Sequence, residues 1–148
     1  MDAQKPIIEI MTKPYWLIDV LPKQVPADAA GQYFKIEPFL LSRLESICSR
    51  FSSVLLKLNC YCDLQVSADG ETWTLNPEPE ELEQAFRRSI TSHSPLFVLI
   101  QPGEAMATFS GDDHYMTLYN PDTELVDLVR QLAAAEGLFV WGPKQTEP

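Results

Sequence analysis

Two stretches of the chain, residues 62–101 and residues 105–142, repeat one succession of sequence patterns. Each stretch has two short strand-like runs around a turn, then a helical pattern, then a short apolar run. The helical pattern opens with Asn76-Pro77 in the first stretch and with Asn120-Pro121 in the second. Because a period of two indicates a strand and a period near 3.6 indicates a helix, the chain is predicted to contain an internal ββαβ duplication. Two units are too few for a solenoid, so we expect two halves of a single sheet.

The first third of the chain adds one strand and one long helix. Residues 15–21 form an aromatic and β-branched run between two prolines, which predicts a strand inside the sheet. Residues 38–58 carry apolar side chains at three- and four-residue steps, which predicts a helix that begins at Pro38. The predicted order is therefore β-α-ββ-α-β-ββ-α-β. This order indicates an α+β fold with two layers, in which about three helices cover a mixed and mostly antiparallel sheet.

The size and composition of the chain fit one cytoplasmic domain. It has 148 residues, of which 45% are hydrophobic, enough for a single core. We expect residues 1–12 and 142–148 to be peripheral or frayed. The longest strictly apolar run, Leu96 to Ile100, is far shorter than the roughly 20 residues that span a bilayer. The opening residues lack a signal-peptide pattern and the cysteines number three, so we expect reduced thiols in the cytoplasm.

Charge is distributed unevenly along the chain. Residues 1–58 contain seven Lys or Arg and six Asp or Glu, a balance of +1, whereas residues 59–148 contain four and fifteen, a balance of -11. The net charge of -10 argues against general binding to nucleic-acid phosphates and against docking on anionic membranes. A basic stripe of Arg43, Arg50 and Lys57 on the long helix leaves nucleic-acid binding as a weaker alternative.

The densest group of ionisable side chains is Asp112-Asp113-His114, which follows Gly111. Two carboxylates and an imidazole could hold a metal ion or perform acid–base chemistry. The alternative is an ordinary hairpin turn, for which Gly-Asp-Asp is typical. A metal site would need ligands from elsewhere in the sequence and none stands out, so we expect no metal. The other histidine, His93, follows a helical pattern, and we expect it to stabilise the last carbonyls of that helix.

Asp19 and Trp16 are the candidate binding residues of the first strand. An acid in an otherwise apolar strand must be paired, hydrogen-bonded or functional. Lys13, Lys23 or an arginine could pair with Asp19, or its side chain could face solvent at the strand end. Trp16 could belong to a surface aromatic patch at a protein interface, or it could pack in the core.

Sequence motifs for common enzyme classes are missing. The chain has no P-loop, no Rossmann glycine fingerprint and no zincin helix, so no cofactor is expected. We predict a non-enzymatic binding or regulatory module that acts through protein–protein contacts, with a protein partner or by self-association. One alternative is an immunity-type inhibitor of a basic toxin, because the acidic half would steer a basic partner. Another is a small enzyme or ligand-binding domain with a cleft between the repeated halves, where Asp19, His93 and residues 112–114 would be the candidate groups.

Overall fold

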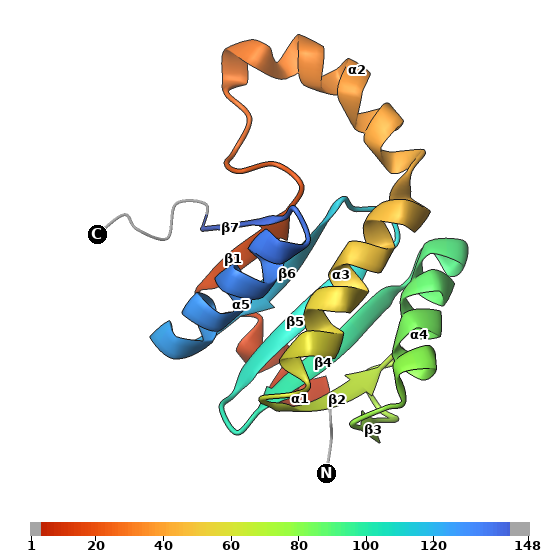
Figure 1. Ribbon diagram of the computed structural model, residues 1–148, viewed down its shortest axis with the longest axis vertical. Coiled ribbons are helices and arrows are strands. Elements are labelled where there is room, and N and C mark those ends of the chain that lie inside the picture. Colours follow the sequence, from red (N-terminus) through yellow and green to blue (C-terminus); the bar gives the residue numbers. More distant parts are fainter. Residues whose placement is uncertain (1–3, 143–148) are drawn as a thin grey trace.

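The computed structural model describes residues 4–142, and its seven strands form one antiparallel sheet (Figure 1). The strands are β1 (Tyr15–Asp19), β2 (Asp63–Ser67), β3 (Thr74–Leu75), β4 (Pro95–Gln101), β5 (Ala105–Ser110), β6 (Tyr115–Tyr119) and β7 (Phe139–Trp141). Their order across the sheet is β3-β2-β4-β5-β6-β1-β7, and all neighbouring pairs are antiparallel. The α+β prediction is therefore confirmed, with a sheet that is wholly rather than mostly antiparallel.

Five α-helices accompany the sheet within the described residues. They are α1 (Gln4–Ile10), α2 (Ala30–Leu41, after the short 3-10 turn η1 at Ala27–Ala29), α3 (Leu44–Leu58), α4 (Pro79–Ser92) and α5 (Thr123–Ala135). Helices α3, α4 and α5 cover one face of the sheet, with α3 packed between the other two. Helix α1 lies against β5 through buried Ile7, so part of the segment expected to be peripheral is packed. Among these helices, none has the length and apolar character required to cross a bilayer.

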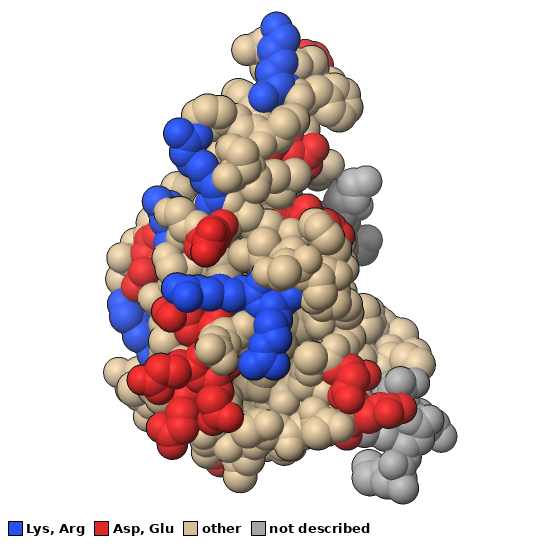
Figure 2. All heavy atoms as spheres, turned by 90° about the vertical axis from the view of Figure 1, so that its right-hand side faces the viewer, with Lys and Arg blue, Asp and Glu red and all other residues tan. Residues whose placement is uncertain are grey.

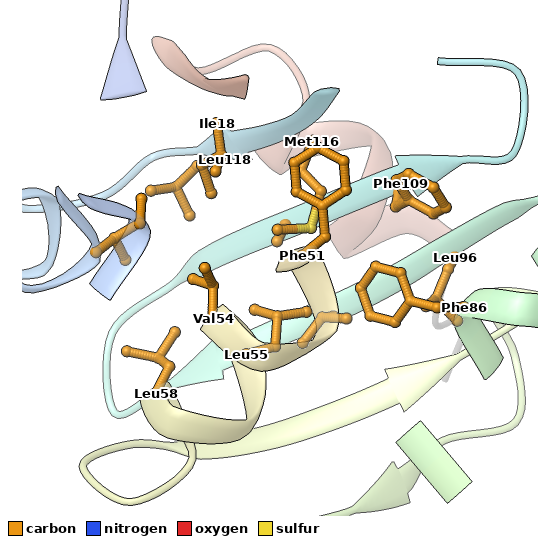
Figure 3. Close-up of a cluster of buried hydrophobic side chains, with 14 of the residues drawn as sticks. Ile18, Phe51, Val54, Leu55, Leu58, Phe86, Leu96, Phe109, Met116 and Leu118 are labelled. Carbon is orange, nitrogen blue, oxygen red and sulfur yellow. The ribbon is translucent and has the colours of Figure 1, made fainter. Parts of the chain in front are cut away.

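The core lies between α3 and the centre of the sheet. Seven apolar side chains of α3 recur at three- and four-residue steps and are buried: Leu44, Ile47, Cys48, Phe51, Val54, Leu55 and Leu58. Figure 3 shows side chains of α3 directed at the strands, where Phe51 meets Phe109 with ring centroids 5.6 Å apart. Phe86 of α4 approaches the same Phe109 ring at 5.0 Å. The period of the sequence pattern thus fixes which face of each helix is buried.

The long helix predicted for residues 38–58 is two helices, which corrects the prediction. Helix α2 ends at Leu41 and α3 begins at Leu44. At the break the Ser42 hydroxyl donates to the carbonyl of Phe39 at 2.6 Å, a local bond that competes with helix continuation. Pro38 lies inside α2 rather than at a helix start. Proline is common in the first helical turn, so the prediction began the helix at Pro38. The helix in fact begins at Ala30, and the prediction did not include residues 30–37.

The two ββαβ units are present in the predicted order but enter the sheet differently. In the first unit, β4 pairs with β2, the first strand of its own unit. In the second unit, β1 lies between β6 and β7, so the last strand pairs with β1 instead. This arrangement places β1 inside the sheet, as predicted, and brings its end beside the start of β6.

Replacement of Phe51 by Ala tests the core. Phe51 is fully buried, so the substitution should lower the free energy of unfolding by about 3–5 kcal/mol. Phe39→Ala is the matched control, because Phe39 is exposed and its ring contacts the Arg43 guanidinium; it should cost less than about 1 kcal/mol. Urea denaturation of both variants provides the measurement, and equal losses would contradict the described core.

Candidate functional site

Asp19 ends β1 as a buried carboxylate with both oxygens bonded. The residue is 2% exposed. Oδ1 lies 3.0 Å from Nδ1 of His114, and the indole Nε1 of Trp141 donates to Oδ2 at 3.3 Å. Because an unpaired buried carboxylate would be very costly, these two donors account for its stability in the sheet. The predicted pairing of Asp19 is thus found, but its partner is His114 rather than a lysine or arginine.

His114 extends this contact to α2. The imidazole side chain is 5% exposed, and its Nε2 lies 2.9 Å from the hydroxyl oxygen of Tyr33. The Tyr33 hydroxyl in turn donates to Oε2 of Glu37 at 2.7 Å. Tyr33 and Glu37 are one helical turn apart and therefore share one face of α2. We call this hydrogen-bonded series, Asp19–His114–Tyr33–Glu37, the polar chain.

The surroundings of the polar chain favour a protonated imidazole and a neutral phenol. The hydrogen bond to Asp19 raises the pKa of His114, against the opposing effect of burial. Burial raises the pKa of Tyr33, and the hydrogen bond to Glu37 raises it further. The imidazole therefore tends to carry its second proton, while the phenol keeps its own.

A cavity of about 400 Å³ lies beside the polar chain. Asp19, Tyr33 and His114 contribute polar groups to its wall, and Phe34 of α2 contributes an aromatic ring. The segment between β1 and η1 adds Leu21, Lys23, Gln24, Val25 and Pro26, and the sheet adds Leu17, Tyr115 and Trp141. Most of this wall is apolar, as is usual for ligand pockets.

The cluster at residues 112–114 divides among three environments. Asp112 is exposed, and its Oδ1 lies 2.7 Å from Nδ1 of His93, the C-terminal cap residue of α4, which has a φ of 53°. Asp113 is half-buried, and burial raises the pKa of its carboxyl. His114 turns inward to Asp19. Within residues 4–142 no group of three or more histidine, cysteine or acidic side chains is placed to hold a metal ion.

Trp16 lies away from the polar chain. It is half-buried and packs against the core on the helix-covered side of the sheet, with the Arg130 guanidinium 5.6 Å from its ring. Sequence patterns did not identify Tyr33, Glu37 or Trp141 as members of the site. The four-residue spacing of Tyr33 and Glu37 was a usable signal only if residues 30–37 were taken as helical.

A second cavity, of about 570 Å³, lies between the two ββαβ units. Its wall includes Glu104, Asp122 and Glu124, together with Tyr61 and Cys62. Asp122 already caps α5, accepting a hydrogen bond from the backbone N–H of Leu125 at 2.8 Å. A cleft exists between the units, as the enzyme alternative requires, but the histidines of that alternative are not among its lining residues.

Replacing Asp19 by Asn tests the buried pair. Asparagine cannot accept at both positions, so the free energy of unfolding should fall by about 1–3 kcal/mol at pH 6. The pKa of His114 is raised in the folded state, so its contribution to stability is present below about pH 6.5 and is lost as the pH rises through the folded value. In the Asp19→Asn variant, the free energy of unfolding should fall less steeply as the pH rises. Asp112→Asn, at the exposed His93 pair, should cost below about 1 kcal/mol and leave the decline intact.

The polar chain resembles a base-orienting arrangement but is not arranged for nucleophilic catalysis. In such chemistry an acid orients an imidazole whose other nitrogen takes a proton from the nucleophile. Here that nitrogen faces the Tyr33 hydroxyl, whose hydrogen is already donated to Glu37. The polar atoms instead satisfy one another and attach α2 to the sheet. No family model, curated protein or solved structure matches the chain, so its function must follow from the geometry of its own residues.

Proposed function

We propose that the chain is a protein-binding module whose contact element is α2. Three large apolar side chains of this helix are uncovered: Phe34 is 69% exposed, Ile36 48% and Phe39 59%. Successive residues of a helix are rotated by about 100°, so these three side chains point to more than one side of α2. A helix that is apolar around most of its circumference is ordinarily enclosed by protein. This uncovered apolar helix is the observation that carries the proposal.

The position of α2 supports an external partner. In Figure 1 this helix projects from the layer formed by α3, α4 and α5. Each of those three helices buries several side chains, whereas of the described side chains of α2 none is in the core cluster and only Leu41 packs against it. A groove on a partner protein that receives α2 would cover these side chains, which is a common mode of peptide recognition.

The distribution of charge also favours α2 as the contact. Residues 20–43 contain Lys23, Lys35 and Arg43 against Asp28 and Glu37, a balance of +1. On the face shown in Figure 2, the largest group of acidic side chains lies toward the end of the molecule opposite α2, and several basic side chains lie nearer to α2, together with a few acidic ones. The cores of protein interfaces are depleted of charge. An interface centred on α2 would therefore leave the acidic surface in solvent.

Photo-crosslinking in cells tests this proposal even while the partner is unidentified. A benzophenone amino acid placed at Phe34 or Phe39 should form covalent adducts with protein, because both positions would lie inside the interface. The control position is Tyr61, which is 70% exposed but lies outside α2. Adducts at positions 34 and 39 well above the level at position 61 are expected, whether the captured protein is a second copy or another chain. Equal adduct levels at all three positions would overturn the proposal.

A further inference from the structure

We propose that protonation of His114 acts as a latch that holds α2 on the sheet and so controls how firmly the binding helix is presented. The inference rests on the proposed function for its effect on binding, while the latch itself concerns the isolated chain. Its basis is the polar chain, which connects β1 to α2 through a nearly inaccessible imidazole.

The number of hydrogens available to the polar chain depends on whether His114 is protonated. The polar chain contains three contacts: Asp19 to His114, His114 to Tyr33, and Tyr33 to Glu37. An ionised carboxylate only accepts, so Nδ1 must donate to Asp19 and the phenol must supply any hydrogen shared with Glu37. A protonated imidazole adds a hydrogen on Nε2, and all three contacts are then hydrogen bonds.

A neutral imidazole leaves this series one hydrogen short. With Nδ1 donating to Asp19, the bare Nε2 can only accept from Tyr33. The single phenolic hydrogen cannot serve both Nε2 and Glu37. The ionised carboxylate of Glu37 is the stronger acceptor, so the contact between Tyr33 and His114 is the one that is lost. Imidazole is a stronger base than a carboxylate, so we assign the extra proton to His114 rather than to Glu37.

Most of the other ionisable groups around the imidazole that carry a charge are carboxyls. Four elements or segments present titratable groups to this region: Asp19 from β1, Tyr33 and Glu37 from α2, Asp113 and Tyr115 from either side of His114, and Lys23 from the cavity wall. Three of these groups are carboxyls, whereas Lys23 is the one cation of this set. The local balance therefore favours an imidazolium.

Helix α2 has few other attachments to the sheet. Among the described side chains, the bond between Tyr33 and His114 is the one hydrogen bond or ion pair that joins α2 to the sheet layer. At its ends α2 continues into η1 and into the break at Ser42 and Arg43. An isolated helix of this length is marginal in water, so loss of the bond should loosen α2. A loosened α2 must be ordered again when it binds a partner, and this ordering costs free energy. The affinity for the partner should therefore be higher when His114 is protonated.

Nuclear magnetic resonance on the full chain without a partner provides the test. The ring signals of His114 report its protonation, and heteronuclear relaxation of backbone amides compares α2 with α3 between pH 5.5 and 8. We expect the α2 amides to become more mobile as the pH rises, with the same midpoint as the His114 ring and above the usual histidine value, while α3 stays unchanged. If the ring titrates while α2 mobility stays constant, the latch is wrong.

Two variants separate the latch from a general loss of structure. Tyr33→Phe removes the hydroxyl but keeps the ring and the Asp19–His114 pair. In this variant α2 should be mobile at every pH while His114 still titrates. His93→Gln alters the exposed histidine and should behave as the native chain. A native pH response of α2 in Tyr33→Phe would overturn the latch. Because no partner is present, these outcomes are independent of the crosslinking result.

Discussion

The packing of α3 onto the sheet is the contact on which the rest of the structure depends. Its buried side chains occupy the centre of the helix-covered face, and α4 and α5 are placed on either side of it. The aromatic group of Phe51, Phe86 and Phe109 joins α3, α4 and β5 into one core. Helix α2 is not part of this layer: of its described side chains only Leu41 packs against the core, and its hydrogen bond to the sheet layer joins Tyr33 to His114.

The contact between α2 and the sheet depends on two buried ionisable side chains, Asp19 and His114. A carboxylate and an imidazole are buried at the junction of β1, β6 and α2, where charge is stable only if every polar atom has a partner. Trp141 and Tyr33 supply the outer partners of the Asp19–His114 pair. One consequence is that the pair fixes the position of α2 relative to the sheet at Tyr33. Another is sensitivity to protonation, because the number of available hydrogens decides how many of the bonds can exist.

The sequence predicted the sheet better than the site, for identifiable reasons. Alternation and turn residues are local signals, so both hairpins and the ββαβ order were accessible. Asp19 stood out as an acid in an apolar strand, and His114 as part of an acidic turn, but nothing local connects residues 95 positions apart. Their contact depends on β1 entering between β6 and β7, a long-range choice of pairing. Tyr33 was missed because the proline inside α2 looked like a helix start.

Hydroxyl-radical footprinting of the dilute chain tests most directly whether α2 is an uncovered apolar helix on a well-packed body. The rate of side-chain oxidation reports solvent access residue by residue. Phe34 and Phe39 should be oxidised readily, in keeping with their exposure, while Phe51 and Phe86 should be protected. Protection of Phe34 and Phe39 to the level of Phe51 in the monomeric chain would contradict it.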